Sequence, residues 1–211
     1  EVTLALLEAH RAGAGEKTPG GDLPLHLAAL SGAPAEVVSA LLEAHRAGAR
    51  EATEPGEQLP LHLALEGATA SDDVIEILLK GYPAAASIAT TSQDDMFAKE
   101  FGDTLPLAKG SLPLHIASRR GKSVRVIKLL TEAYPQAVDF ADANGETPEE
   151  VAGMAHNYRE IIDALREAAK KRPRHIRTSE LDDKCEGGVE TARGAKRRKQ
   201  PDPVRRASVF S

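Results

Sequence analysis

Hydrophobic residues recur along the chain in two kinds of short block, which alternate with polar, turn-rich stretches. The first kind is a Leu-Pro-Leu-His segment that begins at Leu23, Leu59 and Leu112, and a weaker Thr-Pro copy begins at Thr147. These starts are 36, 53 and 35 residues apart. Proline suits the first position of a helix, because its missing N–H would have no partner there in any case. Each block therefore predicts a short helix that begins at its proline.

The second kind of block follows each start at a nearly fixed delay and has apolar residues three and four positions apart. In the first repeat, Val37, Val38, Leu41 and Leu42 share one helical stripe, which predicts an amphipathic helix. The chain also opens with a copy of this block, since residues 1–18 match residues 36–53 at 14 of 18 positions. Each repeat is therefore predicted to contain two helices and a turn.

A period near 35 residues with a Pro-Leu-His start and two helices resembles the ankyrin repeat. The resemblance covers residues 1–170 and implies an all-α fold, an ankyrin-type α-solenoid of stacked helix pairs with hairpin fingers. The structural motif residues that it implies are Leu23, Pro24, His26, Leu59, Pro60, His62, Leu112, Pro113, His115, Thr147 and Pro148. Only Thr147 keeps the family's usual threonine, so the other three starts lack a hydroxyl cap and need another source of hydrogen bonds.

These patterns divide the chain into three parts. Residues 1–22 are expected to be the trailing helix and finger of a truncated repeat, residues 23–170 four repeats with an insertion at about 90–110, and residues 171–211 a disordered basic tail. Glu149 and Glu150 make the fourth repeat polar, as a terminal cap should be. The front has no such cap, so we expect the chain to be a fragment with further repeats upstream.

The composition of the chain limits the type of core and the cellular location that we expect. Aromatic residues make up 3% of the chain and alanine accounts for 35 residues, which favours small, closely packed helices. The single cysteine, Cys185, excludes an internal disulfide and suits a reducing, intracellular location. No apolar run is long enough to span a membrane, and no stretch resembles a signal peptide. Residues 1–169 carry 14 basic and 26 acidic side chains, whereas residues 170–211 carry 13 basic and 6 acidic ones.

Catalytic and metal chemistry are not expected. His26, His62 and His115 occupy equivalent positions in successive repeats, and packed helices about 8–10 Å apart cannot bring them to one ion. His10 and His45 recur in the same way at the ends of second helices. The sequence has no nucleophile elbow, no phosphate-binding loop and no dinucleotide fingerprint. We therefore expect no enzyme activity, no metal and no cofactor.

The expected function is protein binding, as a scaffold or adaptor. The excess of acidic side chains in residues 1–169 favours a basic partner protein and disfavours nucleic acid as a partner. Candidate contact residues are Glu51, Glu54, Glu57, Asp94, Asp95, Arg119, Arg120, Lys122, Asp139, Asp142 and Asn144. The alternative is a regulatory segment of a larger enzyme or channel whose active part lies upstream of Glu1.

Two segments leave further alternatives open. The insertion near residues 90–110 is either a ligand-binding finger or a neutral surface insertion. In the tail, the basic cluster Lys196, Arg197, Arg198 and Lys199 resembles a nuclear-import signal, although contact with nucleic acid or an acidic membrane is also consistent with it. The segment Arg205-Arg206-Ala207-Ser208 resembles a basophilic kinase site, which makes Ser208 a phosphorylation candidate.

Overall fold

The computed structural model describes residues 11–53, 57–67, 69–91, 108–156 and 159–171. Within these residues there are eight α-helices, four short 3-10 helices and no β-strand, which confirms the predicted all-α class. Contacts between Cα atoms separate Glu1–Arg172 from Pro173–Ser211, and every element described below belongs to the first of these parts. The helix predicted within residues 1–10 and the predicted disordered tail lie outside the described residues.

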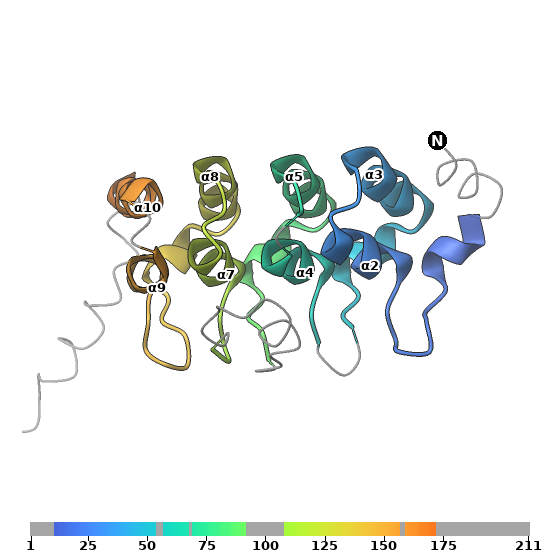
Figure 1. Cartoon of the computed structure of the whole chain (residues 1–211), viewed down its shortest axis with the longest axis horizontal. Coiled ribbons are helices and arrows are strands. Elements are labelled where there is room, and N and C mark those ends of the chain that lie inside the picture. Colours follow the sequence, from blue (N-terminus) through green and yellow to red (C-terminus); the bar gives the residue numbers. More distant parts are fainter. Residues whose placement is uncertain (1–10, 54–56, 68, 92–107, 157–158, 172–211) are drawn as a thin grey trace, which may run out of the picture. The chain divides into compact units, whose positions relative to one another are not determined.

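The α-helices form four pairs, which we call the first to fourth units. In order, they are α2 (Pro24–Ser31) with α3 (Ala35–Ala44), α4 (Pro60–Glu66) with α5 (Asp72–Gly81), α7 (Pro113–Arg119) with α8 (Val124–Ala133), and α9 (Pro148–His156) with α10 (Arg159–Lys171). The first helices α2, α4, α7 and α9 contact one another in sequence order, and the second helices do the same (Figure 1). The units are thus stacked with their two helix types in two rows.

Local sequence explains where the helices begin and end. The first helices begin at their prolines as predicted, and the preceding Leu23 has extended backbone dihedrals. Ser71 and Ser123 cap α5 and α8, because each hydroxyl oxygen accepts a hydrogen bond from a backbone N–H in the first turn. Gly32 ends α2 with a φ of 67°, a left-handed conformation that glycine adopts without strain.

A short 3-10 helix follows each of α3, α5 and α8. The hydrophobic pattern did not predict these 3-10 helices. These are η2 (Arg46–Arg50), η3 (Pro83–Ser87) and η4 (Pro135–Asp139), and a further one, η1 (Arg11–Gly15), precedes the first unit. Proline at Pro83 and Pro135 cannot continue the preceding α-helix, because it lacks an N–H. The small buried residues of these turns, such as Ala85 and Ala86, let them pack closely against the helices.

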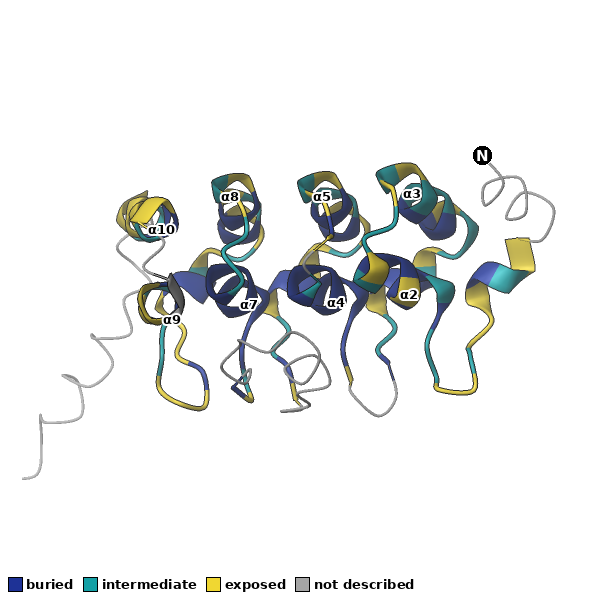
Figure 2. Cartoon of the chain, in the orientation of Figure 1, coloured by how far each residue is buried: buried dark blue, intermediate teal, exposed yellow. Residues whose placement is uncertain are grey.

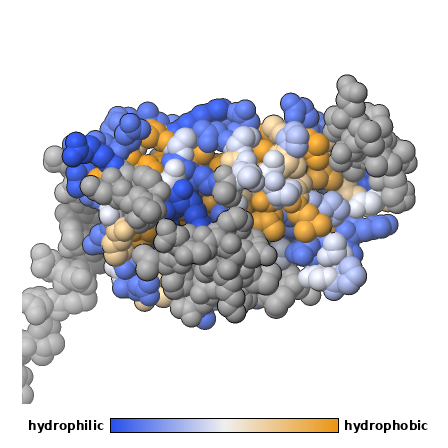
Figure 3. All heavy atoms as spheres, in the orientation of Figure 1, coloured by the Kyte–Doolittle hydropathy of each residue, from blue (hydrophilic) through white to orange (hydrophobic). Residues whose placement is uncertain are grey.

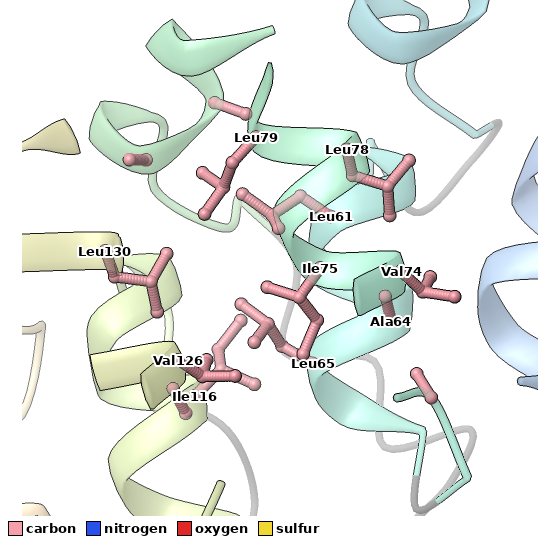
Figure 4. Packing of buried hydrophobic residues seen from close by; sticks show 14 of the residues in the cluster. Leu61, Ala64, Leu65, Val74, Ile75, Leu78, Leu79, Ile116, Val126 and Leu130 are labelled. Carbon is pink, nitrogen blue, oxygen red and sulfur yellow. The ribbon is translucent and has the colours of Figure 1, made fainter. Parts of the chain in front are cut away.

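The hydrophobic core lies between the two rows of helices and between successive units. Leu65 and Ile75 of the second unit face Ile116 and Val126 of the third, and all four side chains are buried (Figure 4). Burying each such side chain stabilises the fold by roughly 1.5–3 kcal/mol. The first helices of the two middle units, α4 and α7, are buried along their whole length, whereas α2 and α9 also expose residues (Figure 2).

Each first helix is preceded by a connection that we call a finger: residues 16–22, 51–58, 88–111 and 140–147. The fingers close at a neck of two hydrogen-bonded residues, of which Thr53 and Gln58 are an example. The Thr53 N–H donates to the Gln58 carbonyl at 3.0 Å, and the Gln58 N–H donates to Thr53 Oγ1 at 3.1 Å. In the third finger, the Thr90 N–H donates to the Ser111 carbonyl at 2.9 Å. Most of the predicted insertion near residues 90–110, namely residues 92–107, lies outside the described residues, but Thr90 and Ser111 on either side of it are paired.

Candidate functional site

A histidine near the start of α2 connects that helix to the following finger. The Leu23 N–H donates to His26 Nδ1 at 2.9 Å, and His26 Nε2 lies 2.9 Å from the Glu51 carbonyl oxygen. Since Nδ1 accepts a hydrogen bond, the ring proton must be on Nε2, which therefore donates to the carbonyl. The same arrangement joins His62 to Leu59 and Ile88, and His115 to Leu112 and Phe140. These bonds satisfy the Leu N–H groups and attach the second, third and fourth fingers to the preceding first helices.

Burial keeps these rings neutral. It lowers the pKa of His62 to about 4, and it also lowers the pKa of His26 and His115. A proton on Nδ1 would face the leucine N–H, so the charged ring cannot keep its bond to the helix start. The geometry therefore needs neutral histidines, which act between the units as hydrogen-bonding links.

The fourth unit begins differently. Thr147 and Glu150 form a reciprocal capping box, in which the Thr147 N–H donates to Glu150 Oε2 at 2.8 Å and the Glu150 N–H faces Thr147 Oγ1 at 3.4 Å. The hydrogen bonds that the Thr147 N–H and the Thr147 hydroxyl donate to this carboxylate lower the pKa of Glu150. Glu150 thus replaces the local contact of a histidine, and the bonds of this capping box stay within the helix start.

Several predicted contact residues of the fingers make internal contacts. Asp142 is buried, and its Oδ1 accepts hydrogen bonds from the backbone N–H groups of Asn144 and Glu146 at 2.9 and 3.1 Å. Glu51 Oε1 lies 2.8 Å from His45 Nε2, and this contact lowers the pKa of Glu51. Asp142 and Glu51 therefore stabilise the fingers that carry them.

Other predicted contact residues are exposed on the fingers. Glu57 lies at the surface of the second finger with a φ of 47°, and Asp139 and Asn144 are exposed near the fourth. Glu54, Asp94, Asp95, His10, Ser208 and the cluster Lys196, Arg197, Arg198 and Lys199 lie outside the described residues.

The predicted basic group at the end of α7 is only partly accessible. Arg119 is buried, Arg120 is half-buried, and the Lys122 ammonium donates to the Gly67 carbonyl of the second unit at 2.6 Å. Burial, together with the nearby Arg120, lowers the pKa of Lys122. In the view of Figure 3, a hydrophilic area lies over this part of the chain, whereas hydrophobic residues gather over the first unit. Lys122 therefore joins two units as well as adding charge.

Sequence reasoning missed two features of this surface. Glu66, the last residue of α4, is a buried carboxyl whose Oε1 accepts a hydrogen bond from Gln58 Nε2 at 2.9 Å. Its only signal in the sequence is a charged residue at a position where the first repeat has Leu30. Phe140 is 42% exposed, and its ring meets the His115 ring edge-on with centroids 6.3 Å apart. Exposed aromatic side chains of this kind are frequent in protein-binding surfaces.

Membrane-spanning and metal-binding features are both absent from the part of the chain that the structure describes. No helix in the described ranges is long and apolar enough to cross a membrane. Across the same ranges, no three His, Cys, Asp or Glu side chains are grouped so that they could hold a metal ion.

In comparisons with known proteins, no family model matches the chain and no curated protein matches it.

Proposed function

We propose that the chain is an ankyrin-type repeat protein, an α-solenoid whose fingers and first helices bind a partner protein. Three features support this proposal: the Pro-Leu-His starts, the stacked helix pairs, and the histidine hydrogen bonds, which recur in three units with residues at equivalent positions. In this role the chain acts as a scaffold or adaptor and has no catalytic step or cofactor of its own. Its contact surface is built from side chains that the stacked units hold in fixed positions.

The fourth finger is the part of the described surface whose charge and exposure best suit a basic partner. Residues 139–150, which are this finger with Asp139 of η4 before it and the start of α9 after it, contain five acidic side chains and no basic one. Asp139 and Glu150 are exposed, Glu146 is half-exposed, and the ring of Phe140 in the same segment is exposed as well. A guanidinium can pair with a carboxylate and also lie against an aromatic face, so this surface suits an arginine-containing segment. We therefore propose a basic protein partner.

Selection from a random peptide library tests this proposal, because such a library samples basic, acidic and neutral segments alike. The library is selected on the immobilised full chain, on the double variant Asp139→Asn, Glu146→Gln, and on a control double variant, Glu36→Gln, Glu43→Gln, with exposed substitutions on α3. We expect arginine and lysine to be enriched on the original chain and on the control, and the enrichment to be lost on the finger variant. No enrichment, or enrichment that the finger variant retains, would contradict a basic partner at this finger.

An intracellular setting is part of the same proposal, because one cysteine in 211 residues is typical of chains that work in a reducing compartment. Nuclear import through Lys196–Lys199 and phosphorylation of Ser208 by a basophilic kinase stay predictions from the sequence. We do not expect a nucleic-acid partner for the acidic units.

A further inference from the structure

Glu66 occupies an unfavourable place for a negative charge. It is the last residue of α4, where the helix dipole disfavours a carboxylate, and only 9% of it is exposed. The adjacent Gly67 approaches the first unit so closely that a Cβ there would lie 2.8 Å from the Leu30 carbonyl oxygen. The Gly67 carbonyl in turn binds the Lys122 ammonium of the third unit. Glu66 therefore lies where three units meet.

The carboxyl is held by an amide of its own unit and is attracted by a cation of the third unit. Gln58 Nε2 donates to Glu66 Oε1, and Gln58 is itself fixed because its backbone N–H binds Thr53 Oγ1 in the finger neck. Arg120, at the end of α7, is the cation that attracts the ionised form of Glu66. The side chain can therefore exist as a neutral acid held by an amide, or as a carboxylate held by the amide and attracted by Arg120.

The other charged groups around α4 have contacts elsewhere or lie on neighbouring elements. On α5, Asp72 accepts from the Ser123 hydroxyl, and Asp73 and Glu76 pair with Arg125. The remaining charged or titratable groups on elements packed against α4 are His26 on α2, Lys80 on α5, His115 and Arg119 on α7, and Arg46 and Arg50 on η2. His62, at the start of α4, is held by Leu59 and Ile88.

We propose that Glu66 forms a proton-linked contact between the second and third units, neutral in mildly acidic solution and ionised toward Arg120 in mildly alkaline solution. Burial supports this, because it raises the pKa of Glu66 to about 7, although Arg120 and Gln58 act in the opposite direction. The charge at this junction therefore changes by one unit across neutral pH. The proposal is independent of any partner protein.

The sign of the effect on stability follows from the two pKa values. In the unfolded chain the carboxyl has its ordinary pKa of 4.5, below its value in the folded chain. The folded state therefore binds the proton more tightly, and the contribution of Glu66 to stability falls as the pH rises from 4.5 through 7. Glu66→Gln, which mimics the neutral form, removes this dependence.

Urea unfolding of the full chain at pH 5 and pH 8 tests the proposal. We expect the unfolding constant of the original chain, relative to that of Glu66→Gln, to increase on the order of 50-fold between these two pH values. The ratio to Glu66→Gln cancels the histidines, which titrate in both proteins. The control Glu57→Gln removes an exposed carboxyl from the neighbouring finger and should leave the pH dependence unchanged.

A carbon NMR titration provides the second measurement and does not depend on how the variants fold. The carboxyl resonance that is missing in Glu66→Gln should titrate near pH 7, and Arg120→Gln should raise that midpoint because it removes the attracting cation. A midpoint near 4.5, or a pH dependence of stability that Glu66→Gln retains, would overturn the proposal.

Discussion

The start of α4 and the start of α9 meet the same local need in two ways. At α4, His62 accepts the Leu59 N–H and also donates to the Ile88 carbonyl, 26 residues away. At α9, Glu150 accepts hydrogen bonds from the Thr147 N–H and the Thr147 hydroxyl, both within the helix start. The local bond is common to both helix starts, so a carboxylate and an imidazole are interchangeable for capping. The imidazole is needed only where a finger must be attached across the unit.

Among the substitutions that test this difference between α4 and α9, removing His62 should have the largest effect on stability. His62→Ala leaves the Leu59 N–H and the Ile88 carbonyl without their buried partner, so we expect the free energy of unfolding to fall by about 3 kcal/mol. Urea unfolding at pH 7.5 measures the change. His45→Ala is the matched control, because His45 is half-exposed and its ring contacts the Glu51 side chain. If both variants lose the same small amount, the link between helix and finger does not stabilise the fold.

Acid should weaken the same link without any substitution. The pKa of His62 is 6.5 in the unfolded chain and about 4 in the folded one, so its contribution to stability is complete above 6.5 and is lost as the pH falls toward 4. The destabilisation caused by His62→Ala should therefore be smaller by about 2 kcal/mol at pH 5 than at pH 7.5. Unfolding both proteins at the two pH values tests this. A difference that does not change with pH would show that the ring is not held neutral.

Within the third unit, removing a buried hydroxyl should have a smaller effect, and it should stabilise the chain rather than destabilise it. Among the residues that the structure describes, Ser118 Oγ is a buried polar atom that has no hydrogen-bond partner, and the first and second repeats have Ala29 and Leu65 at this position. Ser118→Ala should stabilise the chain by about 1 kcal/mol, because it removes an unpaired polar group. Thermal unfolding measures the gain. The control Thr131→Val removes a hydroxyl that donates to the Lys128 carbonyl, so it should destabilise the chain. A loss of stability in Ser118→Ala would indicate that the Ser118 hydroxyl has a hydrogen-bond partner in solution.

The smallest effect should come from the terminal unit. Glu150→Ala removes the acceptor of the Thr147 N–H from an exposed helix start, where water can replace it. We expect a slight loss of protection from hydrogen exchange in α9 and no change in α7, the first helix that packs against it. If α7 also loses protection, the carboxylate carries a link between units as the histidines do.

Much of the local structure could be predicted from the sequence because it depends on near neighbours. Pro24, Pro60 and Pro113 begin helices, and a histidine three residues after each leucine is within reach of the leucine N–H. The missing threonine hydroxyl predicted that some other group must supply hydrogen bonds, and the imidazole does so. The 3-10 helices were not predicted, because a turn of five residues has no hydrophobic period of its own.

The candidate site was less predictable, because the use of each side chain depends on the stacking of units. Asp142 and Lys122 were predicted as partner contacts from their charge, and this stays a prediction; the structure adds that Asp142 accepts hydrogen bonds within a turn and that Lys122 donates to the Gly67 carbonyl. The sequence by itself determined the repeat, the helix starts and the charge balance, since these follow from composition and from residues a few positions apart. Tertiary structure alone decided which carbonyl each histidine reaches and how deeply Glu66 is buried, because these depend on packing between residues that are far apart in the chain.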